Sequence, residues 1–235
     1  MRTAIFSVAV ICTVASWAEA QQTPGSYLVH HQKGADGKFT SVTLPYEPRA
    51  GDLLFFDEYK PHWVVLYKMV GSDGPHHAAL IFRKPDGEFA TVEAGPNDTL
   101  HCKVLPLLPR LQGFQGVLHI RQVKTPIGKE KEEALAKWAL EQHGKRYALG
   151  RLLLQATPIR CRQPLRKELF GATYLDRSSY MCAELAVAGG TLAGLFDPTK
   201  HLGNAIYPRD IIYDDNYDLR ATYHESQLWT AYPLR

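Results

Sequence analysis

Apolar and polar positions along the chain predict a series of short strands. Leu53 to Phe56 form an apolar run of the length expected for a buried strand. The turn-forming residues 71–75 precede a second apolar run at residues 78–83, which we interpret as another strand with His77 at its start. Residues 117–121 have the composition of a further strand.

A loop between two of these strands sets their pairing. Lys84 to Glu88 has the sequence KPDGE, which suits a three-residue hairpin loop with its glycine in the left-handed conformation. Counting back along both strands, Ala79 then faces Glu93, so Glu93 and His77 are diagonal neighbours on one face. A two-residue loop would shift the register and send Glu93 to the other face. The simpler interpretation of Glu93 is an ordinary charge at a strand end.

Two helical patterns accompany the strands. Apolar residues recur on one face from Lys129 to His143, as in an amphipathic helix. A second helix is expected after Ser179, which would act as its N-cap and would place Cys182 at the third helical position. Strands bracketed by helices predict an α+β architecture.

The N-terminal segment, residues 1–20, has the pattern of an export signal. Arg2 supplies a positive start, an apolar stretch follows, and an A-x-A cleavage site ends at Ala20. We therefore expect cleavage after Ala20 and a periplasmic or secreted protein. Residues 21–45 are polar and glycine-rich and are expected to form a loosely structured lead-in, which leaves residues 46–235 as the folded domain.

Composition narrows the classes of partner. The chain has 235 residues and a formal net charge of +3. Removing the signal deletes one base, Arg2, and one acid, Glu19, so the charge does not change. A weak, dispersed positive charge does not favour nucleic acid as a partner. After the signal, no stretch approaches the roughly 18 apolar residues of a membrane-spanning helix, so we expect a soluble protein without a transmembrane segment.

Three cysteines follow the signal, namely Cys102, Cys161 and Cys182. Thiols tend to pair outside the cytoplasm, and an odd number leaves one unpaired. We expect a disulfide between Cys102 and Cys161. Cys182 would then remain a free thiol.

The position of Cys182 suggests a reactive nucleophile. Free backbone N–H groups and the helix dipole at a helix start favour a thiolate, and a histidine partner would serve as its base. His77 is the favoured partner, and His76 takes its place if the strand starts one residue earlier. The alternative is a structural cysteine in a core helix, since cysteine is among the most buried residue types.

Several sequence blocks occur in the order seen in circularly permuted papain-like hydrolases. The chain resembles the YiiX-like branch of the NlpC-type superfamily from about Arg49 to Ile212. The blocks that carry the resemblance are GDLLFF (51–56), HAALI (77–81), VEA (92–94), GKRY (144–147), YMCAEL (180–185) and PRDI (208–211).

The resemblance implies both a fold and a chemistry. It implies an antiparallel sheet or small barrel packed against helices, with Cys182 as nucleophile, His77 as base and Glu93 as the group that orients the imidazole. The implied activity is that of a thiol protease or related hydrolase acting by acyl transfer, without a metal or cofactor. A peptide substrate, especially a peptidoglycan peptide, is favoured over an acyl-lipid substrate, and a non-catalytic envelope binding module is the alternative from another class.

Overall fold

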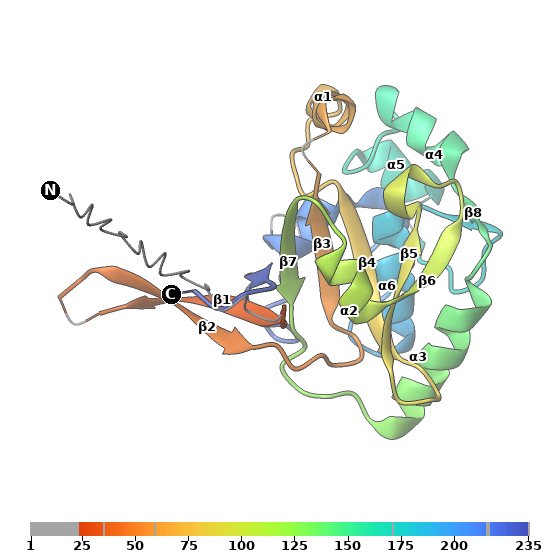
Figure 1. Ribbon diagram of the computed structural model, residues 1–235. Helices are drawn as coiled ribbons and strands as arrows, with labels where there is room; N and C mark the ends of the chain where they lie inside the picture. The colour runs from red at the N-terminus through yellow and green to blue at the C-terminus, as the bar shows by residue number, and fades with distance from the viewer. Residues whose placement is uncertain (1–23, 35, 59, 171, 215–216, 235) are drawn as a thin grey trace, which may run out of the picture.

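The computed structural model describes residues 24–34, 36–58, 60–170, 172–214 and 217–234, and it shows a mixed α+β protein (Figure 1). The expected export signal, residues 1–20, lies outside the described residues. The strands are β1 (Tyr27–Lys33), β2 (Phe39–Pro45), β3 (Leu53–Asp57), β4 (His77–Arg83), β5 (Phe89–Ala94), β6 (Cys102–Pro106), β7 (Val117–Arg121), β8 (Arg146–Tyr147), β9 (Ser179–Tyr180) and β10 (Gln227–Thr230). The α-helices are α1 (Pro61–Met69), α2 (Leu107–Gln112), α3 (Lys129–Glu141), α4 (Leu149–Leu153), α5 (Pro164–Phe170), α6 (Cys182–Leu192) and α7 (Pro208–Ile212), and the short 3₁₀ helices are η1 (Pro96–Asp98), η2 (Leu154–Ala156) and η3 (Gly203–Ala205).

A large antiparallel sheet organises the molecule. Eight strands pair in the order β2-β1-β10-β7-β3-β4-β5-β6, and every pair among them is antiparallel. The remaining two strands, β8 and β9, form a short parallel pair. The predicted strands at residues 53–56, 78–83 and 117–121 correspond to β3, β4 and β7. The predicted helix at residues 129–143 corresponds to α3.

The β4–β5 hairpin has the predicted register. Lys84 N–H donates to the Glu88 carbonyl at 2.8 Å, and Gly87 has a φ of 90°, the left-handed conformation that the loop requires. Ala79 pairs with Glu93. Because side chains alternate between the faces of a strand, His77 and Glu93 point to the same face of the sheet.

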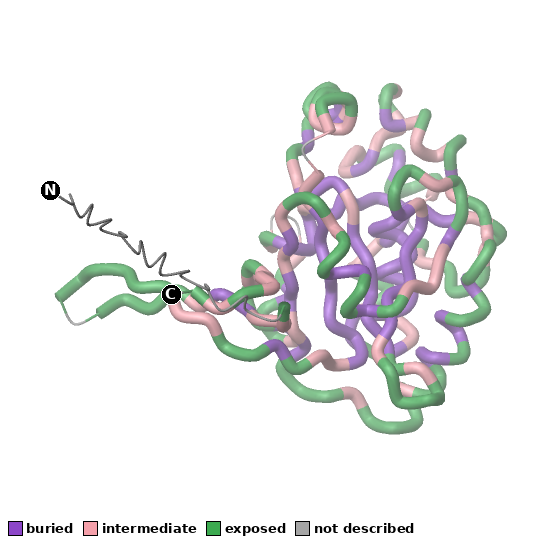
Figure 2. The backbone as a smooth tube through the Cα atoms, viewed as in Figure 1, coloured by how far each residue is buried: buried purple, intermediate pink, exposed green. Residues whose placement is uncertain are grey.

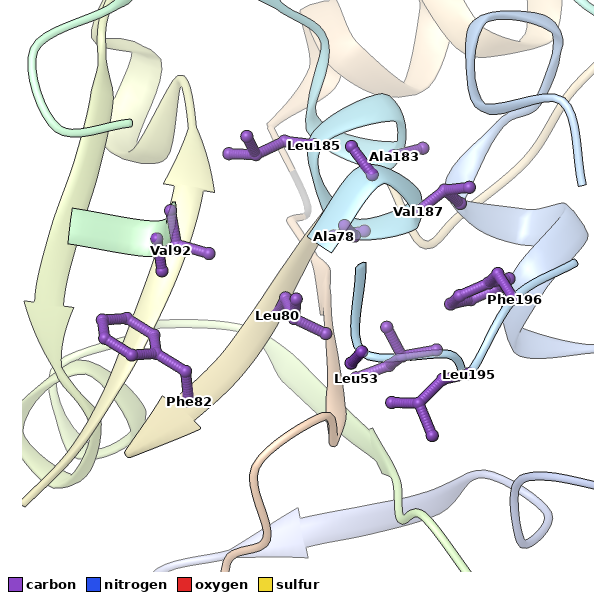
Figure 3. Packing of buried hydrophobic residues seen from close by; sticks show 14 of the residues in the cluster. Leu53, Ala78, Leu80, Phe82, Val92, Ala183, Leu185, Val187, Leu195 and Phe196 are labelled. Carbon is purple, nitrogen blue, oxygen red and sulfur yellow. The ribbon is translucent and has the colours of Figure 1, made fainter. Parts of the chain in front are cut away.

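The main core lies on the other face of the central strands. Leu53, Leu80, Phe82 and Val92 belong to this cluster together with Leu185 of α6 (Figure 3). The helix approaches β4 closely because it carries Gly189 at the contact, where any Cβ would collide with Leu80 and Trp138. This small residue fixes α6 over β4, with its N-terminus near the first residue of the strand.

A smaller cluster covers the face that carries His77 and Glu93. Leu54, Phe56 and Ile81 pack there with Leu107 and Leu111 of α2. The sheet is therefore buried on both faces in its central part, as Figure 2 shows for β3, β4 and β5. Consequently, α6 and α2 lie on opposite faces of the same strands.

The expected lead-in at residues 21–45 is wrong for most of its length, because it contains β1 and β2. Leu28 and Val29 are buried, and they pair with Trp229 and Leu228 of β10, near the other end of the chain. Farther out, β1 and β2 form an arm that projects from the body and is mostly exposed (Figures 1 and 2). Local polarity predicted the exposure of this arm, but it held no information on the distant strand that β1 joins.

The described residues contain no helix that is both long and apolar enough to cross a membrane.

Candidate active site

Cys182 is the first residue of α6. The predicted N-cap, Ser179, is wrong because Ser179 lies in β9, where backbone bonds to β8 hold the chain extended through Tyr180. Met181 is the N-cap instead, and its N–H donates to the Glu184 carboxylate at 3.1 Å. Cys182 is therefore closer to the helix start than expected, among the backbone N–H groups that have no partner within the helix.

The Cys182 thiol and His77 line the same cleft, close enough for each to shift the pKa of the other. Burial raises the pKa of the thiol, but the imidazole of His77 and the backbone N–H groups of Ala78 and Ala183 outweigh burial and hold this pKa below its usual value. Burial likewise lowers the pKa of His77, and the interactions with Cys182 and Glu93 reverse this effect and raise it to about 9. These opposite shifts favour a thiolate–imidazolium pair.

Glu93 occupies the other side of the imidazole. Its Oε2 lies 2.9 Å from His77 Nε2. The Glu93 side chain is completely buried. Burial raises the pKa of its carboxyl group, but hydrogen bonds from His77 and Arg110 lower it to about 2. The hairpin thus brings a charged carboxylate to the imidazole, as the sequence predicted.

Arg110 and Thr91 complete this network, and sequence reasoning missed both. Arg110 of α2 forms a two-pronged contact with Glu93, with Nε to Oε1 at 2.9 Å and Nη2 to Oε2 at 3.0 Å. Thr91 donates its hydroxyl to Oε1 at 2.7 Å. The hairpin register could have predicted the contact of Thr91, because Thr91 is two residues before Glu93 on the same face of the strand. Arg110 had only a weak signal, as a single base in an apolar segment.

His76, the alternative base, points to a different carboxylate. Its Nδ1 lies 3.0 Å from Asp57 Oδ1, and its ring packs edge-on against Tyr67 at 4.9 Å between centroids. It faces the same cleft as His77. Since β4 begins at His77, that histidine is the one that lies beside Cys182 and binds Glu93.

The expected disulfide between Cys102 and Cys161 is absent, and all three cysteines that the structure describes are free thiols. Cys102 lies in the main core cluster with β4 and α6, whereas Cys161 packs with Tyr67, Met181 and other residues of a separate cluster. Burial raises the pKa of each of these two thiols to about 12. Cys182 differs from the other two thiols because its neighbours lower its pKa, and not because the other two cysteines are paired with each other.

Two bases near Cys161 have partners from distant elements. Arg166 is completely buried and donates to the Asn204 carbonyl of η3 at 2.8 Å. Arg162 is partly buried and lies 2.7 Å from the buried Asp210 carboxylate of α7. The local sequence contains no information on these partners.

Cys182 and both histidines line a cleft that is open to solvent. Trp63 and Tyr67 of α1 form one wall, and Tyr147 with Leu149 forms another. Figure 1 shows α1 standing apart from the sheet at one end of the molecule. From Cys182 an apolar recess extends deeper, between α1 and the start of α6. We call these spaces the cleft and the recess.

The Tyr147 hydroxyl is available to a ligand. Tyr147 lines both the cleft and the recess beside Cys182, and its ring packs against Gly95, where any Cβ would collide with it. Burial first, and then the nearby Cys182 thiolate, raise the pKa of this phenol well above its usual value, so the hydroxyl keeps its proton. Among the described residues this hydroxyl has no hydrogen-bond partner, which leaves a donor beside the thiol.

Within the described ranges, no group of three or more His, Cys, Asp or Glu side chains is placed to hold a metal ion.

Comparisons with known proteins give a weak likeness among solved structures. No protein-family model matches the sequence, and no curated protein matches it. Among solved structures, the chain is similar to the metalloprotein YiiX from Escherichia coli O157:H7, with a TM-score of 0.43 and 16% identity over 63% of this chain and 67% of that chain.

Proposed function

We propose that this protein is an exported cysteine hydrolase that cleaves an amide bond by acyl transfer through Cys182, on a circularly permuted papain-like fold. The observation that carries the proposal is the placement of Cys182, His77 and Glu93 in order, with the thiol beside the imidazole and the imidazole hydrogen-bonded to the carboxylate, at the wall of an open cleft. A nucleophile, a base and a group that orients the base are the parts that thiol acyl transfer needs. Here β4, β5 and the start of α6 supply them.

Acylation uses the resting ion pair. The Cys182 thiolate attacks the substrate carbonyl carbon, and the carbonyl oxygen becomes an oxyanion that accepts from the Cys182 backbone N–H and the Tyr147 hydroxyl. The His77 imidazolium donates its proton to the departing nitrogen as the C–N bond breaks. The products of this step are a free amine and a thioester on Cys182, and His77 is left neutral.

Hydrolysis of the thioester restores the site. Water attacks the thioester carbon while His77 accepts a proton from it, and the C–S bond then breaks. The acid leaves, and Cys182 and His77 are again thiolate and imidazolium. Throughout the cycle Glu93 accepts from His77 Nε2, which keeps the imidazole oriented toward the sulfur and supports the positive charge of the ring.

Cell-wall peptides are the substrates we favour. The export signal expected at residues 1–20 would deliver the protein to the envelope, where peptidoglycan peptides offer accessible amide bonds. A lipid-directed acyl hydrolase or acyltransferase is a second candidate, and the recess is the observation that favours it. Its walls include Leu66, Val70, Leu152 and Ile206, which suit an apolar acyl group better than a charged peptide.

A substrate panel tests the proposal. The chain from Gln21 to Arg235 is incubated with muropeptides on one side and with acyl-lipids on the other, and products are identified by mass spectrometry. We expect a muropeptide to be cleaved at an amide bond. Cleavage of acyl-lipids alone would select the second candidate.

Two matched variants separate catalysis from binding. Cys182→Ser should abolish cleavage, whereas Cys161→Ser should remain within about twofold of the unmodified protein, because Cys161 is a buried thiol with no imidazole partner. A protein that binds a substrate of the panel but cleaves none, with Cys182 unreactive toward thiol reagents, would be a binding module and would contradict the proposal.

A further inference from the structure

Arg110 lies at the end of a row of four ionisable groups, of which three are buried and His77 is partly buried. The row runs from Cys182 through His77 and Glu93 to Arg110; the thiol lies beside the imidazole, and the other neighbouring pairs are hydrogen-bonded. It crosses the end of the sheet from the α6 side to the α2 side. Cys182 is 5% exposed, Glu93 0% and Arg110 8%, so water screens these charges little.

The surroundings of Arg110 fix its guanidinium. Its charged carbon lies 4.2 Å from the centroid of the Phe56 ring and 5.6 Å from that of Phe114. Nη1 donates to Asn97 Oδ1 at 3.2 Å, while Nε and Nη2 bind Glu93. The planar group therefore has few alternative positions, and its two-pronged geometry suits a carboxylate better than a lysine would.

The signs of the four charges alternate. In the resting state, thiolate, imidazolium, carboxylate and guanidinium sum to zero. We propose that Arg110 is a positioning residue whose charge completes this electroneutral row and thereby keeps Cys182 in its thiolate form. This inference rests on the proposed thiol chemistry, and it adds a residue that never touches the substrate.

Removing Arg110 would leave a net charge of −1 in a buried site. A buried net charge is costly, and the row can remove it only by taking up a proton. The thiolate is one group that can do so, since the uncompensated carboxylate of Glu93 adds to the negative potential at the sulfur. Removing Glu93 instead would leave a net charge of +1, which favours the thiolate. The two substitutions therefore have opposite signs.

Other titratable groups face Cys182 across the cleft or the recess, and they are Glu58, Tyr67, His76, Asp98, Tyr147, Cys161 and Tyr207. Burial raises the pKa values of the three tyrosines and of Cys161, which keeps them neutral. Lys60 lies 3.1 Å from Glu58 and 2.6 Å from Asp98 and offsets part of their charge. His76 is paired with Asp57 and is the neighbour to control for.

The experiment measures the alkylation rate of Cys182 by iodoacetamide against pH, since this neutral reagent needs no substrate. Arg110→Met should move the midpoint upward by about one pH unit, so that alkylation at a pH below both midpoints is roughly tenfold slower. Arg110→Lys keeps the charge and should stay nearer the unmodified protein. Glu93→Gln should leave the midpoint unchanged or lower it, and the double variant should lie between the two single ones.

Two controls isolate the charge. Arg121→Met removes another buried guanidinium, one bound to Asp214 by two contacts of 2.8 Å but outside the row, and should leave the midpoint unchanged. Repeating the series with His76→Gln excludes titration of His76 as the source of the shift. If Arg110→Met does not fold, comparing Glu93→Gln with the double variant tests the same charge without an unpaired carboxylate.

An unchanged midpoint in folded Arg110→Met would overturn the inference. So would a double variant whose midpoint is as high as that of Arg110→Met, because lost packing and not lost charge would then explain the shift. If the midpoints shift as predicted but the protein cleaves no substrate, the proposed hydrolase function is contradicted and the inference about Arg110 is supported.

Discussion

Two buried thiols line the same recess, and their pKa values are shifted in opposite directions. Cys182 and Cys161 both line it, and both are almost completely shielded from water. Burial raises the pKa of Cys161 to about 12. At Cys182 the same burial is outweighed by an imidazole and by backbone N–H groups, and the pKa falls below its usual value.

The difference lies in what each sulfur contacts. Cys161 donates weakly to the Asn204 carbonyl at 3.7 Å, an acceptor that favours the protonated thiol. Cys182 lies beside His77. Glu93 binds the imidazole of His77, and Arg110 binds Glu93. Burial alone gives an inert thiol, and the charges behind the neighbouring side chain decide whether it becomes a nucleophile.

The largest expected effect is the selectivity of thiol alkylation. At pH 7, iodoacetamide should label Cys182 at least roughly a thousandfold faster than Cys161, because the fraction of each thiol that is thiolate differs by several powers of ten. Peptide mapping after timed quenching measures both rates in one sample. Cys102, another buried thiol with a pKa of about 12, provides an internal reference. Equal labelling of Cys182 and Cys102 would contradict the prediction that Cys182 is the reactive thiol.

Removing the imidazole should make Cys182 behave like Cys161. In His77→Ala the thiolate loses its positive neighbour, and alkylation at pH 6 should slow roughly a hundredfold. His76→Ala is the matched control, since its ring contacts Asp57, and it should change the rate by less than about threefold. A large loss in His76→Ala with none in His77→Ala would transfer the role to the neighbouring histidine.

Glu93 should have a smaller, graded effect on hydrolysis. Glu93→Gln keeps an acceptor for His77 and loses the charge, so kcat should fall roughly tenfold, whereas Glu93→Ala loses both and should fall roughly a hundredfold. Both variants should exceed Cys182→Ala. Circular dichroism checks the fold, because Arg110 loses its partner in each variant. A well-folded Glu93→Ala with full activity would mean that another group orients His77.

The pH profile should show where the contrast disappears. Cys182 has a lowered pKa and His77 a pKa raised to about 9, so the ion pair exists between the two values. Hydrolysis should rise as pH passes the Cys182 value and fall above about pH 9, where His77 loses the proton that the leaving group needs. A rate that keeps rising beyond pH 10 would show that His77 is not the acid.

Sequence predicted the parts of the fold that depend on neighbouring residues. The KPDGE loop sets the β4–β5 register by itself, and so it placed Glu93 beside His77 correctly. β1 and β2 pair with each other but were missed because this segment is polar, and the burial of Leu28 and Val29 depends on β10, about two hundred residues away in the sequence. The Ser179 cap failed for the same reason, since the parallel partner of β9 is the distant β8.

The residues of the candidate site likewise divide into those that local sequence predicted and those that depend on distant contacts. Cys182, His77 and Glu93 were chosen from local motifs and from the resemblance, and the structure brings them together. Arg110 contacts Glu93 and Tyr147 lines the cleft, and the local sequence around each residue does not predict this placement. The expected disulfide rested on counting cysteines, which carries no information on where Cys102 and Cys161 lie in the core.

The central claim is that Cys182 carries the acyl group during turnover. Rapid acid quenching in the presence of an activated peptide ester, followed by peptide mapping, tests it most directly. The account predicts one acyl adduct per molecule, on the peptide that contains Cys182, formed before steady-state turnover and absent from Cys182→Ser. Turnover with no adduct on Cys182, or with the adduct on Cys161, would contradict it.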